Sequence, residues 1–349
     1  MFTLSEASAQ VKKFMVLGGL FIGLLIIAFI LIRIFVIVKN IIAPPPPPTA
    51  TSAFGTLPMQ VFPQNATSKN LTYSINTLSG YLPTLSTVMN VYRMQAIVPN
   101  LLSFNKLQSE VSSIGFPTTY TTISDVVFEW QRQNEGVNLS LKGNSLTGNF
   151  NITSDYTSNA DVLARVRVPA PDQAAQIAAT MLDTMGLVSN DLDQNNIKTK
   201  LFSIVNGNLV PASSQSTAQV IRVDYYQKDI DKIPIYYEKP DTPNINIFVS
   251  GGATGPQVVA VNFIHQAPTQ ESATYSLKTT AQAFEDLKQG KGYIASYNGN
   301  SNNVSVNNVF LAYYISSQQQ DFLMPIFVFT GDNNFYAYVP AVTDGSIGN

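Results

Sequence analysis

The chain has 349 residues and a formal net charge of −2, and charged residues make up only 12% of it. This balance excludes the strongly basic surface with which proteins bind nucleic acid. The chain has no cysteine, which excludes disulfides, thiolate nucleophiles and cysteine-ligated metals. Its length and its 45% of hydrophobic residues are enough for two or three packed units.

The first predicted element is a membrane anchor. Residues 14–32 carry no charge, and the apolar run resumes after Arg33 and ends at Val38. About 20 apolar residues cross a bilayer as a helix, whereas the apolar part of a cleaved signal peptide has about 7–15. We therefore predict a cytoplasmic tail over 1–13 and a transmembrane signal-anchor helix over 14–38.

The orientation of this anchor is predicted from composition. Lysine and arginine are almost equally divided between its two flanks, so the positive-inside rule does not decide the orientation. The rest of the chain is poor in charge and rich in Asn, Ser and Thr. That composition favours a cytoplasmic N-terminus and an extracytoplasmic C-terminal domain. The predicted location is the cell membrane of a bacterium, which the chain would cross once.

Gly19 and Gly23 form a GxxxG pair inside the predicted anchor. Two small residues four positions apart allow two helices to approach closely, so the pair is a candidate for self-association or for contact with a membrane-protein partner. The alternative interpretation is that glycine is simply frequent in such helices.

Residues 39–85 are predicted to be a Pro-rich and polar linker. Five consecutive prolines, 44–48, favour a stiff polyproline II spacer of roughly 15 Å. Recognition of the proline run by a partner is the alternative.

Beyond the linker, apolar spacing and terminal proline or glycine predict three helices, over 101–114, 172–185 and 280–289. Thr279 and Gln282 predict a capping box at the start of the third helix. Alternating apolar residues predict strands, over 126–130, 137–141, 220–226, 245–249, 258–264, 309–315, 325–329 and 335–339. The stretch 251–257 is predicted to join two of them as a hairpin.

The order of these elements predicts an α+β fold, in which the N-terminal transmembrane helix is followed by two or three units of a helix on an antiparallel sheet. The units are a first α+β unit over 86–160, a second over 161–268, a C-terminal helix with strands over 269–343, and a tail over 344–349.

The sequence carries no catalytic or cofactor motif. Its one histidine, His265, lies in a strand pattern and is interpreted as a packed or edge residue, since zinc needs three or four ligands. Residues 191–196 resemble half of a calcium loop but lack its Gly and Glu, so we interpret them as a polar turn. Asp229 and Asp231 are interpreted as part of a solvated turn. We therefore predict no catalytic residue, no metal ligand and no cofactor.

The C-terminal third resembles a known family. Residues 276–295, SLKTTAQAFEDLKQGKGYIA, and 306–342, VNNVFLAYYISSQQQDFLMPIFVFTGDNNFYAYVPAV, are similar to the C-terminal part of YycH/YycI-type regulatory proteins and related PepSY-like domains. Residues 220–237 resemble the strand–turn–strand of the same kind of domain. The resemblance implies a PepSY-like fold and an extracytoplasmic protein that binds and restrains a membrane protein such as a sensor kinase. It transfers no active-site residue.

Composition and resemblance together favour a non-enzymatic, membrane-anchored regulatory or interaction protein of a bacterial envelope, which would modulate a membrane sensor or a protease. The expected partners are the membrane, crossed once, and a membrane protein or a second copy of the chain, without nucleic acid or a small-molecule cofactor. One alternative is a structural or adhesive cell-surface protein. Another is an envelope enzyme of carboxylate or Ser–Lys type.

Overall fold

The structure is a computed structural model. It describes residues 17–18, 21–35, 49–65, 70–134, 136–164, 168–252 and 255–348. The chain divides into two compact units, residues 1–48 and residues 49–349, each of which is described by itself.

In the N-terminal unit the described residues are helical, at 17–18 and over 21–35. A helix that crosses a bilayer needs about 20 residues, and within the described part of the chain no helix is both long and apolar enough to do so. This contradicts the predicted transmembrane anchor over 14–38, and with it the single-pass membrane location and the extracytoplasmic placement. Gly23 lies in the described helix, where a Cβ would meet nothing within 4 Å, and Gly19 lies outside the described residues.

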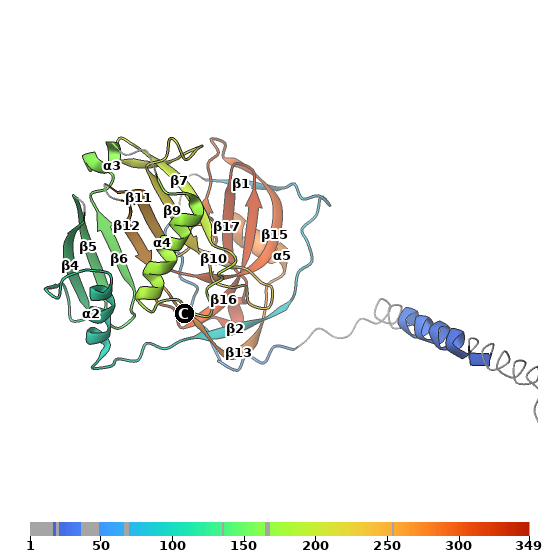
Figure 1. Cartoon of the computed structure of the whole chain (residues 1–349). Helices are drawn as coiled ribbons and strands as arrows, with labels where there is room; N and C mark the ends of the chain where they lie inside the picture. The colour runs from blue at the N-terminus through green and yellow to red at the C-terminus, as the bar shows by residue number, and fades with distance from the viewer. Residues whose placement is uncertain are drawn as a thin grey trace, which may run out of the picture. The chain divides into compact units, whose positions relative to one another are not determined.

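The larger unit contains a nine-stranded antiparallel sheet, here called sheet 1, which occupies one side of the unit in Figure 1. Its central hairpin confirms the strand pair predicted around 251–257, because β11 and β12 pair antiparallel. In spatial order the strands are β3 (Thr121–Thr122), β4 (Val127–Asn134), β5 (Val137–Asn144), β6 (Phe150–Ser154), β12 (Pro256–Phe263), β11 (Ile245–Gly251), β9 (Val220–Tyr225), β7 (Lys198–Val205) and β8 (Asn208–Pro211).

One face of sheet 1 is covered by helices α2 (Ser103–Ser113) and α4 (Pro171–Thr184), and the short helix α3 (Ala160–Ala164) follows β6. Leu107 and Val111 of α2 and Ala178 and Leu182 of α4 are buried in one core with the apolar side chains of the strands. The apolar spacing that predicts these helices therefore also identifies the faces that they bury.

An eight-stranded mixed sheet, sheet 2, forms the other side of the unit. β1 and β10 both run parallel to β15, whereas the other pairs are antiparallel. The strands are β1 (Thr72–Ile75), β15 (Asn303–Ile315), β16 (Phe322–Gly331), β17 (Phe335–Pro340), β14 (Tyr293–Ser296), β10 (Ile235–Tyr237), β2 (Val88–Met94) and β13 (Pro268–Ser276).

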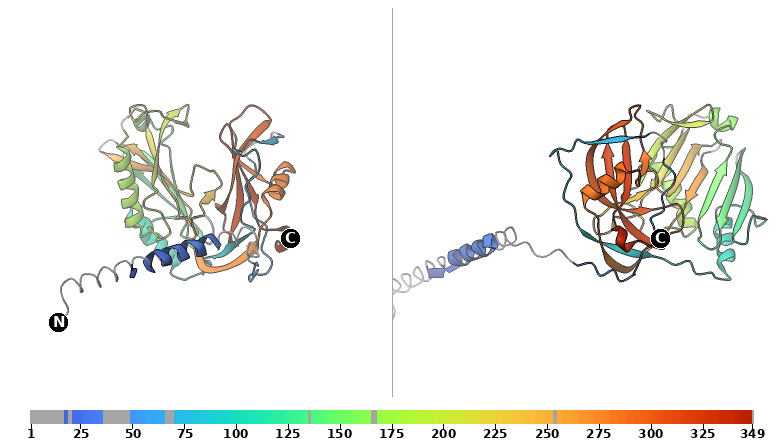
Figure 2. Two further views of the ribbon diagram at one scale, coloured as in Figure 1. Left: turned by 90° about the vertical axis from the view of Figure 1, so that its right-hand side faces the viewer. Right: turned by 180° about the vertical axis from the view of Figure 1, so that it is seen from behind.

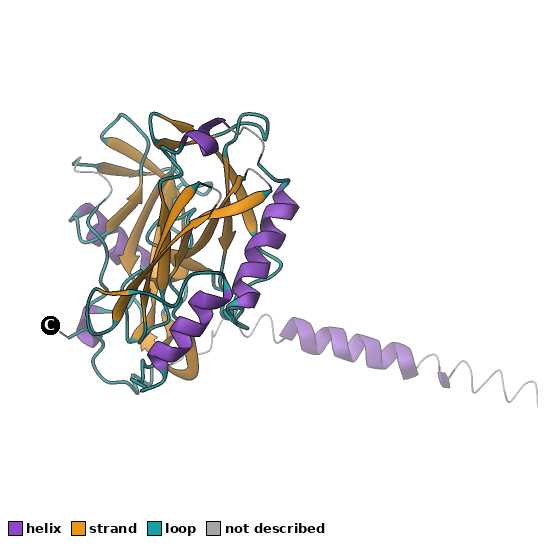
Figure 3. Cartoon of the chain, turned by 60° about the vertical axis from the view of Figure 1, so that its left-hand side comes forward, coloured by secondary structure: helices purple, strands orange, loops and turns teal. Residues whose placement is uncertain are grey.

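Helix α5 (Thr280–Lys288) packs on sheet 2 through Ala283, Phe284 and Leu287, which are buried against strand residues such as Phe329. Its predicted capping box is confirmed: the Thr279 side chain accepts from the Gln282 N–H, and the Gln282 side chain accepts from the Thr279 N–H. A 3-10 turn, η1 (Asp344–Ser346), lies near the C-terminus. In Figure 2, α4 and α5 lie on the outer sides of the two sheets, and Figure 3 shows how strand dominates the unit.

The two sheets are joined by a buried polar seam. Gln266, which follows β12, donates from Nε2 to the carbonyl oxygens of Ser316 at 2.9 Å and Gln318 at 2.8 Å. Its Oε1 accepts from the Gln320 N–H at 3.0 Å. Gln227, after β9, donates to the Gln266 carbonyl at 3.0 Å. The end of sheet 1 is thereby held to the turn between β15 and β16 of sheet 2.

The predicted fold class is wrong in its arrangement. The described residues form two large sheets, one of them with parallel pairs, and not a row of PepSY-like units of one helix on an antiparallel sheet. The physical reason is that β6 pairs with β12 and β2 pairs with β13 and β16, over separations of about a hundred residues or more. Local periodicity identifies a strand but does not identify such a distant partner.

Candidate functional site

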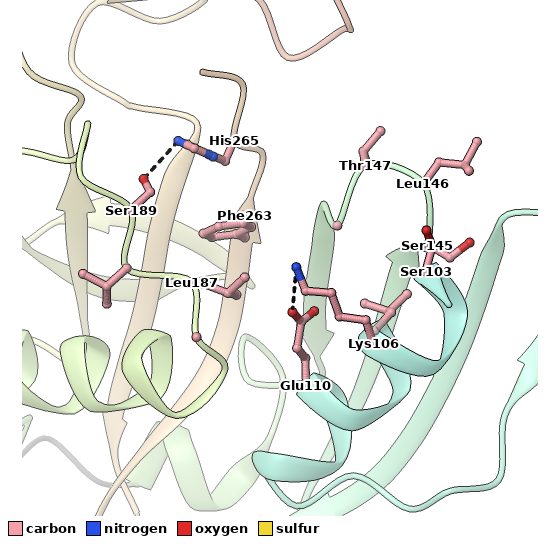
Figure 4. A pocket seen from close by; sticks show the side chains of 14 residues that line it. Ser103, Lys106, Glu110, Ser145, Leu146, Thr147, Leu187, Ser189, Phe263 and His265 are labelled. Atoms are coloured by element: carbon pink, nitrogen blue, oxygen red, sulfur yellow. Dashed lines mark hydrogen bonds and ion pairs between the residues drawn. The ribbon is translucent and has the colours of Figure 1, made fainter. Parts of the chain in front are cut away.

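The candidate site is a pocket of about 300 Å³ on the helix-covered side of sheet 1. Helix α2, the β5–β6 turn, the residues that follow α4 and the end of β12 form its walls. Figure 4 shows Lys106 and Glu110 extending from α2 toward Phe263, with Ser189 and His265 on the opposite wall. The pocket combines charged, hydroxyl and apolar groups from four separate segments.

The wall formed by α2 carries an ion pair one helical turn apart. Lys106 Nζ lies 3.6 Å from Glu110 Oε1, and the side chains are 78% and 12% exposed. Leu107 and Val111, on the neighbouring face of the helix, are buried in the core, and this packing holds Glu110 at the pocket. Burial raises the pKa of Glu110, and the nearby Lys106 partly offsets this rise.

The β5–β6 turn positions His265. Asn144 Oδ1 accepts from the N–H groups of Leu146 and Thr147 at 2.9 and 3.2 Å, and Gly148 adopts a φ of +72° that favours glycine. The next residue, Asn149, accepts the His265 N–H on its Oδ1 at 3.0 Å. A side chain of the turn therefore fixes the backbone from which the imidazole projects.

The His265 ring makes both of its described polar contacts through one nitrogen. Nε2 lies 2.9 Å from Asp191 Oδ2, 3.1 Å from Asp191 Oδ1 and 3.3 Å from Ser189 Oγ. Ser189 Oγ also donates directly to Asp191, and Gln227 Nε2 donates to the same carboxylate at 2.8 Å. Asp191 is thus the centre of this cluster and accepts from three side chains.

The protonation of the cluster follows from these contacts. Burial alone would raise the pKa of Asp191, but the hydrogen bond and charge of His265, together with Ser189 and Gln227, lower it to about 2. The carboxylate is therefore ionised across the physiological range, and it is the acceptor for the Nε2 proton.

This geometry differs from that of a catalytic triad. In a triad, the serine hydroxyl bonds one ring nitrogen and the carboxylate bonds the other, so that the ring can take the serine proton. Here Asp191 and Ser189 approach the same nitrogen, which carries its proton toward Asp191. Nε2 is then not placed to accept the Ser189 proton, and Ser189 Oγ donates to Asp191 instead.

A second pocket of about 200 Å³ adjoins the first, and the two share Leu146, Thr147 and His265 as lining residues. The second pocket extends along residues 95–98 to Gln319. We call the two pockets together the His265 groove. Val98, which lines it, and Leu101, which stands just before α2, are 75% and 99% exposed. Large exposed apolar side chains beside a groove are typical of a contact surface.

Of the other residues singled out in the sequence, Asp191 joins the His265 cluster, whereas Asp193 and Asp231 do not. Asp193, in the predicted polar turn 191–196, accepts from the Asn195 N–H, as a turn residue does. Asp231 accepts from the Tyr92 hydroxyl at 2.9 Å in a turn closed by Ile230 and Ile233. Among the described residues, no group of three His, Asp or Glu could hold a metal ion.

Sequence reasoning missed Glu110 and Ser189, and it assigned His265 only a packing role. Nothing in the spacing of these residues links them, because 79 residues separate Glu110 from Ser189 and 76 separate Ser189 from His265. The helical spacing of α2 was the one usable signal, since it places Lys106 and Glu110 one turn apart on the same side of the helix.

Comparison with known proteins adds little. No family model matches the chain, and no curated protein matches it. A solved structure, that of an uncharacterized protein from Eubacterium rectale ATCC 33656, is similar over 80% of this chain and 90% of its own, with 14% identity and a TM-score of 0.30. At that TM-score the likeness assigns neither fold nor function. The resemblance to YycH/YycI-type proteins stays a prediction that these comparisons do not test.

Proposed function

We propose that this protein is a non-enzymatic interaction protein that binds an extended segment of another polypeptide along the His265 groove. The observation that carries the proposal is that Asp191 and Ser189 both contact Nε2 of His265. This Ser–His–Asp cluster therefore has a geometry unsuited to nucleophilic catalysis. A mixed lining of hydroxyl, charged and apolar groups suits a peptide, whose backbone and side chains present the same mixture.

Two features favour an extended segment over a compact ligand. The groove is elongated, because its two pockets meet at Leu146, Thr147 and His265. Its rim exposes Val98 by 75% and Val188 by 45%, and burial of such side chains on binding is the main source of affinity at protein interfaces.

The test is site-specific photo-crosslinking with the full chain. A benzophenone amino acid is placed at Val98 or Val188, and as a matched control at Val210, which is 42% exposed on edge strand β8. Peptides selected from a display library against the unmodified chain are then added. The proposal expects crosslinks from positions 98 and 188 and none from 210. Equal labelling from all three positions, or none from the groove, contradicts it.

The alternative that this geometry disfavours is a serine hydrolase, in which Ser189, with its Oγ 3.3 Å from His265 Nε2, would be the nucleophile. A fluorophosphonate probe distinguishes the two functions. We expect no labelling of the native protein, whereas labelling that disappears in Ser189→Ala would establish the hydrolase.

A further inference from the structure

Glu110 is the poorly paired charge of the His265 groove. Its side chain is only 12% exposed, yet its ion-pair partner, Lys106, lies 3.6 Å away and is itself 78% exposed. An intrahelical ion pair with one solvent-exposed partner is weak. The side chain is therefore mostly withdrawn from solvent, while its counter-ion is a solvent-exposed lysine at 3.6 Å.

Two other mostly buried carboxylates among the described residues have closer donors. Asp191 accepts from His265, Ser189 and Gln227 at the far wall of the same groove. Asp286 is 12% exposed, like Glu110, but pairs with Lys278 at 2.7 Å and Lys291 at 3.1 Å. Glu110 thus differs from comparable groups in its lack of a close donor, and a ligand cation would supply one.

The surroundings of Glu110 match the chemistry of a long basic side chain. Leu107, Leu187 and Phe263 line the same pocket as the carboxylate. Such apolar surface accommodates the methylene stem of Lys or Arg while the charged head reaches the acid. The other carboxylate at this groove, Asp191, already has His265 Nε2 at 2.9 Å. Glu110 is therefore the groove carboxylate whose partner is more exposed to solvent, since Lys106 is 78% and His265 20% exposed.

We propose that the segment bound in the His265 groove carries a lysine or arginine whose cation pairs with Glu110 in place of Lys106. This inference rests on the proposed function, since it names the chemistry of the partner at the same groove. On binding, Lys106 swings into solvent and the partner's cation completes the carboxylate's hydrogen bonds.

The test uses four libraries of blocked hexapeptides, randomised at five positions and carrying Lys, Arg, Gln or Glu at the third. Immobilised peptides are probed with the full chain and with two variants, Glu110→Gln and Lys106→Gln. For the native chain we expect Lys and Arg peptides to bind about tenfold more tightly than Gln peptides, as a charge-assisted hydrogen bond would give.

The variants separate the possible results. Glu110→Gln should abolish the preference for Lys and Arg, and Lys106→Gln should keep or strengthen it, because a competing cation is removed. If the native chain binds Lys and Gln peptides equally at the groove, the basic-partner inference is overturned while the interaction function stands. If no library binds at the groove, both fail. Urea unfolding of each variant verifies that it is folded.

Discussion

His265 Nε2 lies 2.9 Å from Asp191 Oδ2, with the two side chains 20% and 28% exposed. This pair joins the segment that follows β12 to the turn that follows α4. Since Gln227 contacts both Asp191 and the Gln266 carbonyl, the pair also links the groove to the polar seam between the sheets.

The stability contributed by Asp191 should depend on pH. Its pKa is about 2 in the folded protein, below the ordinary 3.8, so its contribution is present above pH 4 and is lost as pH falls toward 2. We expect Asp191→Asn to lower the free energy of unfolding at pH 6 by about 2 kcal/mol. The difference from the native protein should close near pH 2, measured by urea unfolding. The exposed Asp125→Asn serves as the control, and a pH-independent difference would contradict the assignment.

Glu110 should show the opposite sign. Burial raises the pKa of this carboxyl, so the ionised form opposes folding above the ordinary pKa and has no effect well below it. We expect Glu110→Gln to raise the free energy of unfolding on the order of 0.5 kcal/mol at pH 7 and to leave it unchanged at pH 3. Glu285→Gln, at a 59% exposed side chain, is the control. A loss of stability at pH 7 would show that Glu110 is structurally paired and not held for a ligand.

Gln266 should be essential to the seam. Its amide makes three hydrogen bonds to the β15–β16 turn while only 6% exposed. Gln266→Ala leaves those backbone groups buried without partners, which should cost about 2–3 kcal/mol. Exposed Gln319→Ala, in the same turn, should cost nothing measurable. Thermal unfolding monitored by circular dichroism compares them, and equal melting temperatures would refute the role of the seam.

Lys278 pairs with two carboxylates at the same distance but in different surroundings. Both Asp286 Oδ2 and Asp344 Oδ1 lie 2.7 Å from its Nζ, and their side chains are 12% and 81% exposed. Asp286→Asn should lower the free energy of unfolding by about 1.5–3 kcal/mol, whereas Asp344→Asn should lower it by less than about 0.5 kcal/mol because solvent screens the exposed pair. Chemical denaturation measures both, and the reverse order would contradict this account.

The capping box of α5 gives a local prediction. Thr279→Ala removes the acceptor for the Gln282 N–H and should cost about 1 kcal/mol. Thr279→Ser keeps the hydroxyl and should cost much less. Urea unfolding distinguishes them, and an alanine variant as stable as the serine variant would show that the cap is replaced by solvent.

The sequence by itself determined the elements whose causes are local. The ends of α5 follow from Thr279, Gln282 and Gly290, because a cap is made between residues three or four positions apart. The β11–β12 hairpin follows from two apolar runs around a glycine-rich turn. The alternation of apolar and polar residues also predicted β9. In the structure both faces of β9 are buried. Its polar residues Arg222 and Asp224 pair with each other, and Arg222 also donates to the Asp241 carbonyl.

The tertiary structure alone decided which strands pair and which side chains meet. β1 runs parallel to β15 across about 230 residues, and Glu110, Ser189 and His265 converge only because α2, the end of α4 and β12 pack on one sheet. Such contacts arise from burial of the whole apolar surface at once, and burial is non-directional, so it leaves no periodicity in the local sequence. The low exposure of the Glu110 side chain, whose ion-pair partner Lys106 lies 3.6 Å away, also follows from the packing of α2 and not from the local sequence.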